Sequence, residues 1–353
     1  MTSFDRINRG STLTTGDITM APQRPARHDR ERGQVLVIVA GGILTLLLLA
    51  GLVIDGGIAL FNRRDAQNSA DLMALAGTKF VANVHQGAPN IQASTYAALA
   101  ASAAANDCRS TNSVPCTWQA WFVAGSSGGP SDIGSVTPGA GVPANALGVR
   151  VLVERQPGTF LVGLAGINEW DVDTQATAVA EAPKKAPAGQ LLPIAFKAQT
   201  GGYTPGQVYD ITDGKDAPGG FGYISWTGSN DPNALATSIC TPDNPEFSTP
   251  HSFNGDPGKS NSASVRACLD QWVHNGETIL IPIYDTLTGT GNNVVYHITG
   301  VAAFVVTSRG QPAVDNIRGY FVEIYPYTNP VPAGLGSQPP TADDTSFFLG
   351  LVK

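Results

Sequence analysis

Two short segments contain the residue types of catalytic or nucleotide-binding loops. Residues 125–129, GSSGG, have the letters of a nucleophile elbow, in which a strained strand–turn–helix exposes the serine. Pro130 and a Gly/Ser-rich loop follow instead of a helix, so we expect Ser127 to have no catalytic role. Residues 256–262, DPGKSNS, resemble a phosphate loop, but Phe253 replaces the glycine that such a loop requires. These two segments therefore predict no catalytic serine and no nucleotide partner.

Acidic and histidine side chains give a weaker indication of a metal site. Asp210, Asp213 and Asp216 recur at intervals of three in a glycine-rich segment, and such carboxylates can bind Ca²⁺. The spacing differs from that of an EF-hand loop, so a solvated turn is the favoured interpretation and a calcium site the alternative. The five histidines have no paired ligand spacing. We therefore expect no cofactor.

The most prominent feature of the sequence is a single long apolar segment near the N-terminus. No charged residue occurs between Arg32 and Asp55, and the run from Val35 to Ile54 contains twenty residues. A helix of that length rises about 30 Å, the thickness of the hydrocarbon core of a bilayer. A secretory signal has an apolar segment of only about 7–15 residues, and a buried core helix would need other long helices around it. The sequence therefore predicts a transmembrane helix over residues 34–55, with Val35–Ile54 as the membrane anchor.

Charges and cysteines indicate the orientation of this helix. An excess of arginine before the span favours a cytoplasmic N-terminus. Arg24, Arg27, Arg30 and Arg32 lie just before it, whereas only Arg63 and Arg64 lie just after it. All four cysteines follow the span, and an even count fits disulfides in an oxidising compartment. The simplest pairing joins nearest neighbours, Cys108 with Cys116 and Cys240 with Cys268, although connectivity stays open and free buried cysteines are the alternative.

The remaining sequence divides into segments of different composition. Residues 1–33 are polar and predict a disordered cytoplasmic tail. Residues 56–182 read as alanine-rich helices and a small sheet, and the proline-rich residues 183–189 as a linker. Residues 190–353 read as a β-rich domain with two short helices, at about 232–240 and 260–273. The predicted fold class is therefore α+β, with one N-terminal transmembrane helix.

The charge of the chain bears on its partners. The net charge is −7, and the acidic excess lies in the distal region, beyond Gln190. Nucleic-acid binding favours clustered lysine and arginine, so we expect no nucleic-acid partner.

Residues 32–78 resemble the N-terminal segment of TadE/TadG-like Flp (Tad) pilus-assembly proteins. The shared features are Arg32-Gly33 before the span, Asp55-Gly56 at its end, Arg63-Arg64, and the helix QNSADLMALAG from Gln67 to Gly77. In the last of these, Leu72-Met73 replaces two alanines of the usual motif. The resemblance covers about fifty residues, and the strands within residues 147–182 are also similar to those of such proteins.

This resemblance implies a membrane-anchored, non-enzymatic component of a Flp/Tad-type pilus-assembly or secretion apparatus. The bilayer and other assembly proteins would be its partners. The bacterial inner membrane would be its location, with the N-terminus in the cytoplasm and the C-terminal region outside. A membrane-tethered module that binds a ligand or a surface is the alternative function.

The family motif also supplies candidate contact residues, which are Asp55, Gln67, Asn68 and Asp71. For Asp55 the simpler interpretation is that it marks the end of the span. Prepilins carry a glutamate five residues after the cleaved glycine. Relative to Gly33 that position is Ile38, so we expect the span to be retained in the mature protein.

Overall fold

The computed structural model describes residues 28–87, 94–125, 129–210, 222–228, 232–256, 262–290, 293–309, 317–326 and 338–352. Helices and strands combine in these ranges as an α+β protein, which confirms the predicted fold class. The chain divides into two units, residues 1–53 and 54–353.

The first helix, α1 (His28–His85), contains the whole apolar run. From Gly33 onward, this helix is long enough and apolar enough to cross a membrane. Leu36, Val37 and Val53 leave 73%, 70% and 75% of their surfaces exposed. Such a continuous apolar surface is unfavourable in water and expected in lipid. The helix therefore has the properties of a membrane anchor.

A six-stranded sheet, here called the proximal sheet, follows the helix. Its order is β14-β15-β4-β3-β1-β2, where the strands are β1 (Cys116–Ala124), β2 (Ser131–Ser135), β3 (Gly148–Arg155), β4 (Val172–Glu181), β14 (Ile324–Pro326) and β15 (Phe347–Val352). β15 pairs antiparallel with β4, with Phe348 opposite Glu181. Two strands that the sequence places in the distal region thus complete the proximal sheet.

The alanine-rich face of α1 packs on this sheet together with helix α2 (Thr95–Ala105), whose N-cap is Ser94. The buried residues of this face are Ala66, Ala70, Met73, Ala74 and Val81. A Cβ atom on Gly77 would lie 2.9 Å from Leu99 Cδ2 of α2 and 3.3 Å from Val149 Cγ2 of β3. The small residues of the family motif therefore allow close packing within the chain.

Thr78 fixes α1 to the sheet through the backbone. Its hydroxyl donates to the carbonyl of Ala178 at 3.0 Å and accepts from the N–H of Val149, also at 3.0 Å. Thr78 is fully buried, so both hydrogen bonds are shielded from water.

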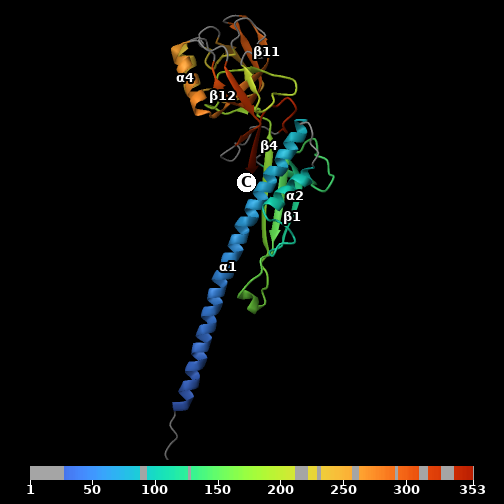
Figure 1. Ribbon diagram of the computed structural model, residues 1–353, viewed down its shortest axis with the longest axis vertical. Helices are drawn as coiled ribbons and strands as arrows, with labels where there is room; N and C mark the ends of the chain where they lie inside the picture. The colour runs from blue at the N-terminus through green and yellow to red at the C-terminus, as the bar shows by residue number, and fades with distance from the viewer. Residues whose placement is uncertain are drawn as a thin grey trace, which may run out of the picture. The chain divides into compact units, whose positions relative to one another are not determined.

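The distal region contains a second sheet, with two helices packed on it (Figure 1). Its main order is β6-β11-β12-β10-β8, and β13 joins β12 to β7. The strands are β6 (Phe196–Lys197), β7 (Val208–Asp210), β8 (Ile224–Ser225), β10 (His251–Gly255), β11 (Thr278–Thr288), β12 (Val295–Ser308) and β13 (Arg318–Val322). The helices are α3 (Pro232–Cys240) and α4 (Ala263–Asn275), close to the predicted positions.

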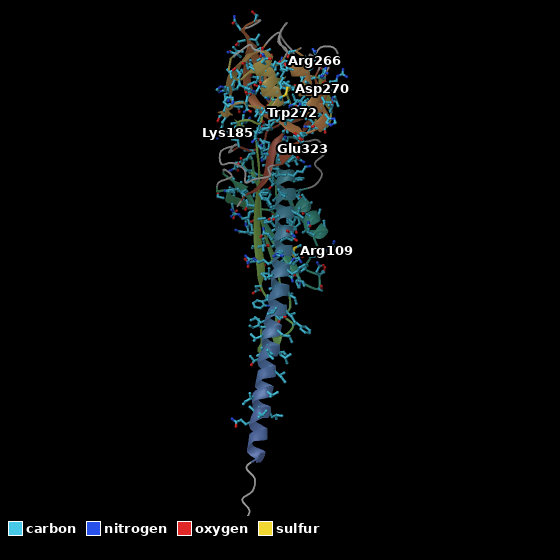
Figure 2. The ribbon with its side chains drawn as sticks, turned by 90° about the vertical axis from the view of Figure 1, so that its left-hand side faces the viewer. Arg109, Lys185, Arg266, Asp270, Trp272 and Glu323 are labelled. Atoms are coloured by element: carbon cyan, nitrogen blue, oxygen red, sulfur yellow. A yellow bond between two sulfur atoms is a disulfide. The ribbon has the colours of Figure 1, made fainter. Side chains whose placement is uncertain are left out.

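Helix α4 is held at several points along its length (Figure 2). A disulfide joins Cys268 to Cys240 of α3. Trp272 Nε1 donates to the carbonyl of Ile239 at 2.6 Å. Asp270 accepts two hydrogen bonds from Arg309, which follows β12, at 2.5 and 2.8 Å. These contacts join α4 to α3 and to the segment after β12.

The segment 183–189, for which the sequence predicts a linker, is packed. Strand β5 (Lys185–Ala186) pairs with β9 (Phe247–Ser248), and Ala186 is fully buried. Lys185 Nζ lies 2.7 Å from Glu246 Oε1. The connection between the two sheets is thus tied to the distal region.

His85, the last residue of α1, gives the fold a pH dependence. Its Nε2 lies 2.9 Å from the carbonyl of Ala146. Partial burial lowers the pKa of His85 below its ordinary value of 6.5, and the hydrogen bond to Ala146 only partly opposes this effect. The unfolded chain therefore binds the proton more readily than the folded chain.

We expect the free energy of unfolding to be constant above about pH 7 and to fall as the pH drops below the unfolded pKa of 6.5. Urea titrations at pH 7.5 and 5.5 would measure the difference. His85→Gln keeps a donor for Ala146 but does not titrate, so its difference should be smaller. An equal difference in both proteins would assign the pH dependence to other groups.

Candidate interaction surfaces

Asp55 lies at the end of the predicted span and is buried. Its carboxylate accepts three backbone hydrogen bonds, from the N–H groups of Phe160, Leu161 and Val162, at 2.8, 3.0 and 2.7 Å. These groups begin the short 3₁₀ helix η1 (Val162–Ala165), in the connection between β3 and β4. Asp55 therefore has an internal role that neither sequence interpretation included, because it holds this connection against α1.

Gln67 also has an internal role. Its Nε2 donates to Asp71 Oδ1 at 2.7 Å and to the carbonyl of Gln175 on β4 at 3.3 Å. Asp71 is half-buried, whereas Asn68 and Leu72 are exposed. Within the family motif, Asn68 and Leu72 are therefore exposed and do not pack inside the chain.

Asn68, Asp71 and Leu72 line an open pocket of about 530 Å³, here called the acidic pocket. Its other lining residues are Asp65, Ser69, Asn106 and Asp107. Arg155 on β3 pairs with one of the three carboxylates, since its Nη1 lies 2.5 Å from Asp65 Oδ2. The pocket therefore keeps a net negative charge, which suits a cationic or hydrogen-bond-donating group of a partner.

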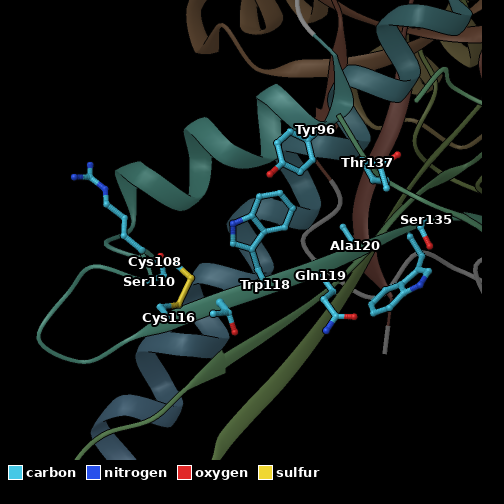
Figure 3. Close-up of a pocket in the computed structure, with 13 residues that line it drawn as sticks. Tyr96, Cys108, Ser110, Cys116, Trp118, Gln119, Ala120, Ser135 and Thr137 are labelled. Atoms are coloured by element: carbon cyan, nitrogen blue, oxygen red, sulfur yellow. A yellow bond between two sulfur atoms is a disulfide. The ribbon is translucent and has the colours of Figure 1, made fainter. Parts of the chain in front are cut away.

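A second open pocket, of about 560 Å³, lies between α2 and β1 and is here called the aromatic pocket (Figure 3). Tyr96 of α2 and Trp118 of β1 point toward one another, with ring centroids 5.1 Å apart. The Cys108–Cys116 disulfide lies at one end and joins the segment after α2 to the first residue of β1. Partly exposed aromatic rings of this kind commonly anchor protein–protein contacts.

Several sequence candidates lie wholly or partly outside the described residues. These are Ser127, the phosphate-loop-like segment at 257–261, and Asp213 and Asp216. Asp210 is described, and its Oδ2 lies 3.3 Å from Arg318 Nε. Within the described ranges, His, Cys, Asp and Glu form no group of three that could hold a metal. The predicted solvated turn at Asp210, Asp213 and Asp216, and its calcium-binding alternative, are therefore untested.

Sequence reasoning missed two features of these surfaces. The partners of Asp55 are backbone N–H groups, which leave no mark on residue type. The contact between Tyr96 and Trp118 joins a helix and a strand whose relative placement no local pattern specifies. One signal in the sequence could have pointed to the partner of Asp55. The apolar segment 159–167 lacks the alternation of its flanking strands, which distinguishes it from them.

Comparison with known families finds a match for the N-terminal part of the chain. Residues 33–83 match the Tad family model, described as "Putative Flp pilus-assembly TadE/G-like". The match covers the apolar run, Asp55 and the motif from Gln67 to Gly77, and it confirms the resemblance predicted over residues 32–78. No curated protein and no solved structure matches the chain.

Proposed function

We propose that this protein, with its Tad-type N-terminal segment, is a membrane-anchored component of a Flp/Tad-type pilus-assembly or secretion apparatus. It acts through protein–protein contacts and not through catalysis. The match over residues 33–83 carries the proposal, because it includes both the anchor and the helix surface that projects beyond it. The protein would lie in the bacterial inner membrane, with its N-terminus in the cytoplasm.

The acidic pocket is the proposed contact site for another assembly protein. Ala70, Ala74 and Gly77 of the motif pack inside the chain. Gln67 contacts Asp71 and β4. Asn68 and Leu72 have no such internal use and remain at the surface. Their position beside carboxylates favours a partner that presents lysine, arginine or amide donors.

Asn68→Arg should abolish or strongly reduce pilus assembly while leaving the protein at its normal level in the membrane. The substitution adds a bulky positive charge where the partner's cation would bind, and an exposed helix position changes folding stability by only about 0.5 kcal/mol. Surface fibres, counted by electron microscopy, and immunoblots of the membrane fraction would measure the two effects.

Asn275→Arg is the matched control, since it makes the same substitution at an exposed position of α4. It should leave fibre formation unchanged. Normal fibres in the Asn68→Arg strain would reject the acidic pocket as the contact site. Normal fibres after deletion of the gene would reject the assembly function and favour a membrane-tethered binding module.

The orientation is tested separately. A reporter enzyme that is active only outside the cytoplasm should be active when fused after Lys353, because the arginine excess precedes the span and all four cysteines follow it. A reporter that is active only in the cytoplasm, fused at the same position, should be inactive. The opposite pattern would reverse the topology without affecting the family match.

A further inference from the structure

The connection between β3 and β4 carries an unusual set of exposed apolar side chains. Phe160, Leu164 and Ile167 leave 74%, 84% and 48% of their surfaces exposed. Outside α1, the only other large apolar side chain exposed to this degree in the described residues is Val208. Three of the four thus occur within eight residues, here called the apolar loop (Phe160–Ile167).

Asp55 fixes the position of this loop. The three hydrogen bonds to Phe160, Leu161 and Val162 hold it against the residue that directly follows the apolar run of α1. The apolar loop therefore lies at Asp55, where the sequence predicts that the membrane anchor ends.

The helix on either side of Asp55 is also apolar and exposed. Ile54 precedes it, and Leu60 and Phe61 follow it within about 10 Å along the helix axis, before the exposed Arg63 and Arg64. Asp55 thus lies in a zone where the helix surface suits lipid. A carboxylate in such a zone is costly unless it is paired, and the three N–H groups of the loop supply that pairing.

We propose that the apolar loop inserts into the headgroup–acyl boundary of the bilayer as a second membrane contact beside α1. Phe160, Leu164 and Ile167 would face lipid, and the loop backbone would cover the charge of Asp55. The proposal commits to lipid because the loop is continuous, through Asp55, with the membrane anchor itself. It concerns the seating of the protein on the membrane and goes beyond the proposed role in pilus assembly.

The test uses the full-length chain reconstituted into vesicles of phosphatidylethanolamine and phosphatidylglycerol. All four cysteines are in disulfides, so Leu164→Cys adds a single thiol for a nitroxide label. Electron paramagnetic resonance power saturation then compares collisions of the label with oxygen, which concentrates in lipid, and with a nickel chelate, which stays in water. Leu46→Cys, within the anchor, and Val208→Cys, an exposed apolar position on β7, serve as the lipid and water references.

The label at residue 164 should show an oxygen-to-nickel accessibility ratio several-fold higher than the label at residue 208, approaching that at residue 46. Phe160→Cys should give the same result if Leu164→Cys does not fold. Adding Asp55→Ala to Leu164→Cys should lower the ratio, because the loop is then released from α1.

Two results would overturn the proposal. One is a ratio at residue 164 equal to that at residue 208, which would place the loop in water. The other is low accessibility to both reagents together with dipolar broadening, which would show that the loop packs against a second copy of the chain. Neither result depends on fibre formation, so the proposed function can stand or fall independently.

Discussion

Phe347→Ala is expected to lower the free energy of unfolding of the region outside the membrane by about 3–5 kcal/mol, the usual cost of deleting a buried phenylalanine ring. Phe347 is fully buried, and it packs with Ala82 of α1, Ala180 of β4 and Ile324 of β14. A cavity there removes contacts with three elements at once, because the ring packs against residues of α1, β4 and β14. Urea denaturation of the purified full-length protein in detergent would measure the loss.

Val208→Ala is the control for this prediction. It also shortens an apolar side chain in a strand, but Val208 is largely exposed, so the change should stay within about 0.5 kcal/mol. If Phe347→Ala were as mild as the control, β15 would not be packed in the proximal sheet. Limited proteolysis offers a second measure, since release of β15 should make the C-terminal segment sensitive to protease.

Cys268→Ser is expected to produce the second large loss, of roughly 3–4 kcal/mol in the chain-entropy model of disulfides. The Cys240–Cys268 bond spans 28 positions in the sequence and joins α3 to α4. Cys268 is buried beside Val265 and Leu269, so the new serine hydroxyl would also lose contact with water. The stability of this variant should be measured on the full chain, because a fragment starting at residue 190 would lack β4, the partner of β15.

Cys240→Ser separates the two contributions. Cys240 is exposed, so this substitution removes the covalent link without burying a hydroxyl. Both variants should lose most of the same free energy, and mass spectrometry of the non-reduced wild-type protein should find the Cys240–Cys268 peptide. A destabilised Cys268→Ser beside an unchanged Cys240→Ser would mean that the link contributes nothing to stability.

Much of this fold could be predicted from local patterns. Twenty uncharged apolar residues require one long helix, and the spacing of Ala66, Ala70 and Met73 marks the helix face that packs on the sheet. The two disulfides join the nearest neighbours along the chain, as the simplest pairing suggested. These features depend on residues close together in sequence, where periodicity and spacing are informative.

The remaining features depend on long-range contacts. Phe347–Val352 is an apolar run interrupted only by Gly350, and nothing in its pattern distinguishes β4 from the distal strands as its partner. Segment 183–189 has the composition of a linker, yet its Ala186 is opposite Phe247 of β9 and is fully buried. The backbone donors that Asp55 binds follow it by more than a hundred positions. A local pattern cannot indicate them, so the sequence suggests only that Asp55 marks the end of the span.

The pairing of β15 with β4 has a consequence for how the protein is made. β4 emerges from the ribosome long before β15, with the whole distal sheet synthesised between them. Until residues 347–352 arrive, β4 is an open edge that can pair with another nascent chain. A chain cut short between β13 and β15 would still contain every strand from β5 to β13 but would keep that edge permanently. We therefore expect such a product to aggregate more readily than the full chain, in which β15 covers the edge of β4.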